Sequence, residues 1–441
     1  MVGNRLLPAL VLVLAGGLAC KESVLLPTEE IPERDLIVVA RPPSDRQPSP
    51  GQTRVLGTGW YANVEIDAKG VLHLAWTDAD LGDVMYTRWE PGQPSPVPPQ
   101  PVELDGAAGG YLQLVLGPGD APVLSYYHQD RRVLRLAHRQ ADLAKMKAAG
   151  AALVAPLEAK PVFTPLVPGE KAPRQPSEGM GPGWHGEDVA FGDQVGMAGK
   201  LFVDQQGRPH LTYYTKNERF RYARRPASKD AFGPLVNGIF QKYDVDERAG
   251  GSYTMSTDLA VTKDGTAVVS YCHWNYIDSV LRVGWLAPGK DAFEVIDATK
   301  LDRIVDGWHS VLVPVDDHQF EVFSVATAAL KLFSGRFDTR APKAFAERQV
   351  WVERPGPTVV ERAADGTFWV LTRGQGFRSL GEEPGVWLIE IPQGDMGAAK
   401  RKLLERGSQR DPWLDLAVRP DGRPVAVWTS TETDSMRMYA P

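Results

Sequence analysis

The stretch "LFVDQQGRPHLTYYT", residues 201–215, decides the fold, because the same order of features recurs along the chain. A short alternating run ends in a turn with glycine, and a second, almost wholly apolar run follows. Glycine supplies the positive φ that a tight hairpin turn demands. The clearest further copies are VEIDAKGVLHLAWTD (64–78), LAVTKDGTAVVSYCH (259–273) and LAVRPDGRPVAVWTS (416–430). Weaker copies are LVLGPGDAPVLSYYH (114–128), VPVDDHQFEVFSVA (313–326) and VVERAADGTFWVLT (359–372).

Each copy is followed by a polar loop and a third strand-like run, and a fourth run precedes most of the next copies. Four short antiparallel strands, repeated mostly about every fifty residues, are typical of propeller blades. The last copy ends at Pro441 after three strands, and "DLIVVAR" (35–41) can supply the fourth. We therefore predict an all-β, closed seven-bladed propeller over 35–441, with an insertion at about 139–196.

The repeat resembles that of bacterial envelope β-propellers of the sialidase-like (BNR) type, whose turns read DxxGxPHxxYY. Residues 204–214 carry the closest match. The resemblance implies the fold and an envelope location much more strongly than an activity. The Ser-x-Asp-x-Gly-x-x-Trp box of true sialidase blades does not occur in the chain, so a sialidase activity is not implied.

The first twenty residues, MVGNRLLPALVLVLAGGLAC, resemble a bacterial lipoprotein leader. Arg5 precedes a short apolar run, and small residues lead to Cys20, the expected lipid acceptor. We predict a signal peptide at 1–19 and a lipidated tether at 20–34, which attaches the protein to a membrane. Lys21 is not the aspartate of inner-membrane retention, which favours the outer membrane. The alternative is an ordinary secretory leader in which Cys20 is incidental.

Bulk composition excludes some classes of function. A hydrophobic content of 43% supports a large core, and 43 glycines with 36 prolines favour short elements joined by turns. The formal net charge of −6 is unsuited to a general phosphate-binding field, so we expect no nucleic-acid partner. We expect a monomer without an intramolecular disulfide, because only Cys272 remains beside the lipid acceptor.

Aromatic residues stand six positions after the turn residue in six of the seven copies. Counted from Gly70, Asp120, Gly207, Gly265, Asp317, Gly366 and Gly422, the occupants are Trp76, Tyr126, Tyr213, Tyr271, Phe323, Thr372 and Trp428. We interpret this position as packing between blades. Three positions after the turn, His73 and His210 share a place that is otherwise apolar. A hydrogen-bonded core imidazole is the expected role of both.

Loops between second and third strands share one rim of a propeller with the starts of the blades, and this rim is rich in aromatic residues and histidine. A ligand is expected there, where loops from all blades converge. The candidate binding residues are Trp60, Tyr61, Trp184, His185, Tyr253, His273, Trp274, Trp308, His309 and Trp413.

The acidic and basic side chains of this rim support two weaker alternatives, a glycosidase or lyase site and a calcium site. For a glycosidase or lyase, acid–base roles would fall to Glu187, Glu353 and Asp411 with help from Arg354. Asp78, Asp80 and Asp83 resemble part of a calcium loop, although a solvated hairpin tip explains them as well. Otherwise we expect no cofactor. Cys272 and His273 should point to opposite faces of a strand and not form a catalytic pair.

Together these features favour a non-enzymatic, lipid-anchored propeller of the cell envelope that binds a protein or a glycan through its aromatic rim. The alternative is a hydrolase or lyase that acts on a polysaccharide, with acidic residues over the central pore. The insertion at 139–196 is interpreted either as a lid or docking arm or as a passive surface loop.

Overall fold

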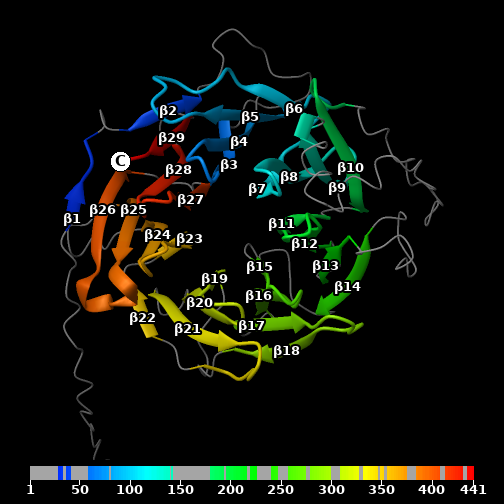
Figure 1. Ribbon diagram of the computed structural model, residues 1–441, viewed down its shortest axis with the longest axis vertical. Coiled ribbons are helices and arrows are strands. Elements are labelled where there is room, and N and C mark those ends of the chain that lie inside the picture. Colours follow the sequence, from blue (N-terminus) through cyan, green and yellow to red (C-terminus); the bar gives the residue numbers. More distant parts are fainter. Residues whose placement is uncertain are drawn as a thin grey trace, which may run out of the picture.

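The computed structural model describes residues 28–32, 36–40, 58–78, 81–139, 141–142, 179–192, 195–215, 219–225, 240–246, 257–274, 279–298, 308–326, 331–345, 348–351, 355–374, 384–407, 413–430 and 435–441. These residues form seven antiparallel sheets around a central axis, and we call each sheet a blade (Figure 1). The predicted all-β, seven-bladed propeller is confirmed.

Six of the blades contribute four consecutive strands each, from the inside of the ring outward. Blade 1 holds β3 (Thr58–Ile66), β4 (Leu72–Asp78), β5 (Asp83–Trp89) and β6 (Gln100–Glu103). Blade 2 holds β7 (Gly110–Gly117), β8 (Ala121–His128), β9 (Val133–Arg139) and β10 (Trp184–Phe191). Blade 3 holds β11 (Met197–Val203), β12 (Pro209–Tyr214), β13 (Phe220–Arg224) and β14 (Gln241–Asp246). Blade 4 holds β15 (Thr257–Val261), β16 (Ala267–Trp274), β17 (Ser279–Leu286) and β18 (Glu294–Asp297). Blade 5 holds β19 (Trp308–Pro314), β20 (Gln319–Ala326), β21 (Lys331–Asp338) and β22 (Arg348–Trp351). Blade 6 holds β23 (Pro355–Arg362), β24 (Phe368–Gly374), β25 (Gly385–Ile391) and β26 (Lys400–Arg406).

Blade 7 closes the ring with strands from both ends of the sequence. Its inner strands are β27 (Leu414–Val418), β28 (Pro424–Ser430) and β29 (Ser435–Tyr439), and β2 (Ile37–Ala40) pairs antiparallel with β29. The prediction that 35–41 completes the last blade is therefore confirmed. The strand β1 (Thr28–Glu30) adds a parallel fifth strand to β26 of blade 6. Two short 3-10 turns, η4 (Pro392–Gly394) and η5 (Met396–Ala398), lie between β25 and β26.

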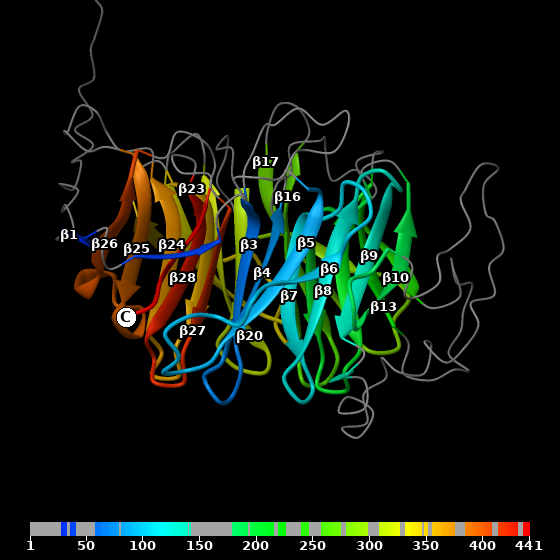
Figure 2. The same ribbon diagram turned by 90° about the horizontal axis from the view of Figure 1, so that it is seen from above.

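The two rims of the ring differ in what they carry. The turns between first and second strands lie on one side, drawn at the bottom of Figure 2, which we call the lower rim. The starts of the inner strands and the loops between second and third strands lie on the upper rim. Each inner strand contacts the inner strands of both neighbouring blades, so the ring is continuous around its axis.

The core lies between the blades, in seven clusters that each draw on two adjacent blades. The recurring aromatic position is confirmed as packing of this kind in five blades, where it places Trp76, Tyr126, Tyr213, Tyr271 and Trp428 against the preceding blade. These side chains are at most 2% exposed. Thr372 is fully buried at the same place in blade 6.

Blade 5 departs from the predicted register by one residue. Pro314 pairs with Phe320 there, as Val203 pairs with Pro209 in blade 3, so Ser324 corresponds to Tyr213. Phe323 packs instead on the following blade, with Val360 and Phe368. The cause is the turn "DDHQ", which contains no glycine to mark its alignment with the other copies.

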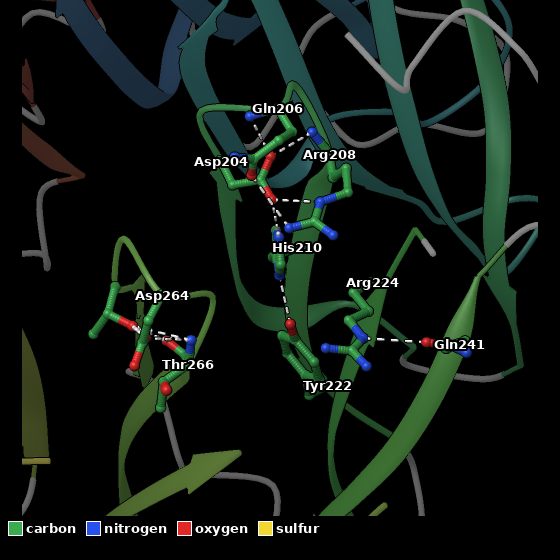
Figure 3. A network of polar contacts seen from close by, with 10 residues as sticks. Asp204, Gln206, Arg208, His210, Tyr222, Arg224, Gln241, Asp264 and Thr266 are labelled. Carbon is green, nitrogen blue, oxygen red and sulfur yellow. Dashed lines mark hydrogen bonds and ion pairs between the residues drawn. The ribbon is translucent and has the colours of Figure 1, made fainter. Parts of the chain in front are cut away.

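The two core histidines form the same network in blades 1 and 3. His210 contacts Asp204 through Nε2 (3.2 Å) and the Tyr222 hydroxyl through Nδ1 (2.5 Å), as Figure 3 shows. His73 likewise lies between Tyr86 (2.7 Å) and Asp67 (3.6 Å). Burial lowers the pKa of both imidazoles. The predicted role of hydrogen-bonded core imidazoles is confirmed.

Part of the predicted insertion at 139–196 belongs to the regular fold. Residues 184–191 form β10, which pairs along its length with β9, and the Gly181 amide donates to the Val102 carbonyl of blade 1. The extra chain therefore lies within blade 2, between β9 and β10. Residues 143–178 lie outside the described residues.

The clasp made by β2 can be tested by comparing two shortened chains. A chain that begins at residue 41 lacks β1 and β2, whereas a chain that begins at residue 31 lacks only the three-residue β1. We expect loss of β2 to lower the free energy of unfolding by about 2–4 kcal/mol, at about 1 kcal/mol for each lost ladder hydrogen bond. Guanidinium denaturation measures the difference, and equal stability of the two chains would contradict the clasp.

Candidate functional site

Four aromatic rings meet at the upper rim, where the inner strands of blades 7, 1 and 2 begin. We call Trp60, Tyr61, Tyr111 and Trp413 the aromatic mouth. The Tyr61 ring lies 3.9 Å from that of Trp413 and 5.4 Å from that of Tyr111, measured between centroids. Trp60 lies 6.4 Å from Trp413. All four side chains are half-buried. The structure thus brings together three predicted binding residues and adds Tyr111.

The backbone of the mouth is strained in a way that recurs around the ring. Tyr61 and Tyr111 have φ values of 52° and 53°, in the left-handed region that costs a non-glycine residue about 1–2 kcal/mol. Each lies in a bulge, where the inner strand shifts register against its neighbour. Ala198 and His309 have similar φ values at the corresponding bulges of blades 3 and 5. Bulges of this kind redirect side chains at binding sites.

Asn63 holds the bulges of blades 1 and 2 together. Its side-chain amide donates to the carbonyl oxygens of Tyr61 (2.6 Å) and Leu112 (3.0 Å), and its oxygen accepts the Leu114 amide (3.2 Å). Asn63 is 6% exposed, so these bonds are shielded from water. The positions of Tyr61 and Tyr111 are therefore fixed relative to each other. Burial also raises the pKa of both phenols, which keeps them neutral hydrogen-bond donors.

Below the mouth, five inner strands place charged groups around the axis. We call Glu65, Asp258, Glu361 and Asp415 the axial carboxyls, and Lys200 lies among them. Two of them join neighbouring blades, since Asp258 accepts the Leu312 amide (2.7 Å) and Asp415 accepts the Val64 amide (2.9 Å). In both cases an inner strand is bonded to the inner strand of the next blade.

Burial raises the pKa of all four axial carboxyls, and neighbouring carboxyls add to the rise for Glu65, Glu361 and Asp415. Burial is the largest cause in every case. The pKa of Glu361 rises to about 8, helped by Asp415 and Asp258, and that of Asp415 rises to about 6. The positive charge of Lys200 acts in the opposite direction and lowers the pKa of each carboxyl. Solvent reaches the Glu361 side chain, but the ring of strands encloses it, so its charge lacks the solvation of bulk water.

The sequence did not single out the axial carboxyls. Each lies in a run that has the pattern of an ordinary alternating inner strand. One signal was available: "DLAV" occurs twice, at 258–261 and 415–418, at the same place in the repeat. A carboxylate at the start of two equivalent inner strands indicates a shared role, here the bond to the next blade.

The structure corrects the placement of Trp184, His185 and Glu187. They lie in the outer strand β10, and Trp184 and His185 are at its lower-rim end, away from the aromatic mouth. Trp184 is 2% exposed and its ring packs edge-on against Tyr86. Glu187 is buried and pairs with Arg225. Sequence reasoning took this segment for the start of blade 3, because its partner strand β9 is far away in the sequence.

Other predicted residues are engaged elsewhere or lie outside the description. The His273 imidazole lies 3.1 Å from the Asp246 carboxylate and 2.9 Å from Arg282, between blades 3 and 4. His309 is half-buried at the upper end of β19. Trp274 and Trp308 belong to β16 and β19, but their side chains are not described. Tyr253, Glu353, Arg354 and Asp411 lie outside the described residues.

Within the described ranges, no three His, Cys, Asp or Glu side chains are arranged to hold a metal ion. Of the predicted calcium residues, Asp78 accepts the Leu81 amide (3.2 Å), which fits the alternative of a hairpin tip. Asp83 lies opposite Asp78 in the antiparallel ladder of β4 and β5. Asp80 lies outside the described residues, so the calcium hypothesis stays a prediction.

Comparison with known proteins gives similarities of fold. No protein-family model and no curated protein sequence matches the chain. The β-propeller domain of the Trilobed protease from Pyrococcus furiosus is 9% identical, with a TM-score of 0.44 over 86% of this chain and 94% of its own. A Dyadobacter fermentans protein of unknown function is 9% identical, with a TM-score of 0.41 over 92% and 98%. An endo-arabinase from Bacteroides thetaiotaomicron is 8% identical, with a TM-score of 0.36 over 55% and 92%.

The raised pKa of Glu361 predicts a pH-dependent effect of replacing it. Its stabilising contribution is present below the usual value of 4.5 and is lost as the pH rises through the folded value of about 8. We expect Glu361→Gln to match the parent at pH 4.5 and to exceed its free energy of unfolding at pH 8.5 by about 1 kcal/mol, after allowance for solvent screening.

Denaturant unfolding at the two pH values measures this difference. Glu294→Gln, on the outer strand β18 with an exposed side chain, is the matched control and should show no such change. If Glu361→Gln and the parent differ in free energy of unfolding by the same amount at both pH values, the Glu361 carboxyl has an ordinary pKa.

Proposed function

We propose that this protein is a non-enzymatic propeller of the bacterial cell envelope that binds a glycan at the aromatic mouth. The observation that carries the proposal is the meeting of four half-buried rings from three blades above the axial carboxyls. Indole and phenol rings offer flat apolar faces to the apolar face of a sugar ring, and the phenol hydroxyls add hydrogen bonds. The axial carboxyls are acceptors for sugar hydroxyls.

A glycan fits these features better than a protein partner does. Asn63 and the bulges fix Tyr61 and Tyr111 before any ligand arrives, and preorganisation of this kind reduces the entropic cost of binding. A protein partner would need a larger contact area of about 800 Å² on this side. Four rings at one part of the rim suit a smaller ligand. Protein binding is an outcome that the capture experiment below can reveal.

The alternative, a hydrolase or lyase acting on a polysaccharide, is favoured by one observation. Two neighbouring axial carboxyls have pKa values of about 8 and about 6, for Glu361 and Asp415. A pair of carboxyls whose pKa values are set apart is what an acid and a base require. These residues replace Glu187 in the proposed catalytic set, because Glu187 pairs with Arg225 at the outer strands.

Glycan binding can be tested by capture from envelope extract. The bait is a soluble chain that starts after Cys20, compared with the double variant Trp60→Ala, Trp413→Ala. Truncating two central rings should weaken binding well beyond the roughly 30-fold expected for one ring, since a single such residue contributes about 2 kcal/mol at a binding site. Tyr243→Ala, which removes a half-buried ring on the outer strand β14, is the control.

Equal recovery of glycan by the parent and the double variant would contradict the proposal. Recovery of a protein alone would favour the other kind of partner. New reducing or unsaturated ends in glycan incubated with the parent, absent with Glu361→Gln, would favour the enzymatic alternative.

The location of the protein in the cell is a separate part of the proposal. We propose that Cys20 carries the lipid anchor, that the protein is a monomer of the outer membrane, and that the repeat is of the sialidase-like type, as its DxxGxPH turn suggests. In the part of the chain that the structure describes, no helix is long and apolar enough to cross a membrane.

The anchor can be tested by replacing each of the two cysteines. Cys20→Ser should move the protein from the membrane fraction to the soluble fraction, because acylation of that thiol is the proposed attachment. Cys272→Ser is the matched control, since Cys272 is buried in β16. Immunoblots of separated fractions measure the outcome. A Cys20→Ser protein that stays with the membrane would contradict lipidation at this residue.

A further inference from the structure

One histidine of the core lacks the partners that His73 and His210 have. His138 lies near the lower-rim end of β9 and is fully buried. Neither of its ring nitrogens has a hydrogen-bond partner among the described residues. His73 and His210, by contrast, each lie between an aspartate and a tyrosine hydroxyl. Buried polar groups are normally hydrogen-bonded, so the unpartnered imidazole of His138 requires an explanation.

The groups around His138 belong to blades 2 and 3, which meet at this seam. Alternation along β9 puts His138 on the same face as Leu134 and Leu136, which pack on blade 3. Within blade 2, Val123 of β8 lies opposite His138 on one side. His185 of β10 lies on the other side, with 6.2 Å between the two imidazole centroids. The neighbours of His138 within its sheet are thus an apolar side chain and a second imidazole.

A buried ion pair crosses the same seam. Arg225 follows β13 of blade 3 and is 2% exposed, and its guanidinium donates to the Glu187 carboxylate of β10. The guanidinium also lies over the Phe240 ring, 5.2 Å from the ring centroid. The positive charge of Arg225 acts on His138 and opposes protonation of the imidazole. Glu187, the carboxylate that β10 presents to this seam, is already paired with a cation.

Protonation of His138 is therefore costly in the folded protein. Burial lowers its pKa from the usual 6.5 to about 3, and Arg225 and His185 contribute to the shift. Burial lowers the pKa of His185 as well. Since the folded value lies below the usual one, the closed seam has its full stability above pH 6.5 and loses it as the pH falls toward 3. Acid thus favours any state in which His138 reaches water.

Packing alone does not require an imidazole at this place. In blade 2, His138 is paired in the ladder with Val123, three positions after the turn residue. The residue paired with the corresponding Val268 of blade 4 is Trp285. Trp285 is 9% exposed and packs on the following blade with Leu312. An apolar ring fills the same place there without a group that titrates, so what His138 adds to its seam is sensitivity to pH.

We propose that the seam between blades 2 and 3 is an acid-sensitive switch, in which protonation of His138 separates the lower-rim ends of β9 and β10 from blade 3. The ion pair between Glu187 and Arg225 breaks when these strands move, and the core side chains Val189 and Phe240 become exposed. Contacts between the inner strands β7 and β11 hold the two blades together during this local opening. The aromatic mouth lies at the other rim, so the switch does not rest on the proposed glycan site.

Hydrogen exchange measured by mass spectrometry tests the proposal on the soluble chain that starts after Cys20. After correction for the pH dependence of intrinsic exchange, we expect amides of β9 and β10 to exchange at least tenfold faster at pH 5.0 than at pH 7.5. A pKa of 6.5 in the open state and of about 3 in the closed state favours opening by about 30-fold between these pH values. Amides of blade 6, across the ring, should show no such change.

Three variants assign the response to His138. His138→Phe places an apolar ring where blade 4 has Trp285 and should lose the response. His138→Leu should lose it as well and serves if the larger ring proves unstable in thermal melts. His318→Gln, a half-buried histidine on the lower rim of blade 5, is the matched control and should respond like the parent. The proposal is overturned if the parent exchanges equally at both pH values, if the His138 variants respond like the parent, or if acid speeds exchange equally in every blade.

Discussion

The packing of each blade against its two neighbours is the interaction on which the rest of the structure depends. A twisted four-stranded sheet with two apolar faces cannot bury both by itself, so each of the seven core clusters takes side chains from two adjacent blades. Trp76 and Trp428 show the consequence at the seam: each is at most 2% exposed only because blade 7 lies between blades 6 and 1. The antiparallel pairing of β2 with β29 completes that blade and leaves the ring without an open end.

Closure of the ring creates a second requirement at the axis. Each inner strand has neighbours in its own sheet on one side only, so amides on its other edge need acceptors. Asn63, Asp258 and Asp415 supply them for the next blade in the ring, at Leu114, Leu312 and Val64. The use of carboxylates as these acceptors concentrates negative charge around the axis. Burial is the main cause of the raised pKa values of Glu361 and Asp415, and that concentration of charge adds to it.

Features that repeat could be predicted from the sequence, whereas features that depend on ring closure could not. The buried positions of Tyr213 and His210 followed from comparing the copies, because every blade packs against its neighbours in the same way. Phe323 packs between blades as predicted, but its alignment with the other copies was wrong by one residue, since its turn has no glycine to fix the register. Trp184 was placed on the wrong rim, because a long stretch of chain separates β10 from its partner β9.

The candidate site was partly predicted, for a related reason. Trp60, Tyr61 and Trp413 were expected on the same rim, and closure brings Tyr61 within 3.9 Å of Trp413 although they are far apart in the sequence. Glu65, Lys200 and Glu361 come from three blades, and no local pattern shows that they meet at the axis. Function in such a ring is therefore expected where one blade departs from the others.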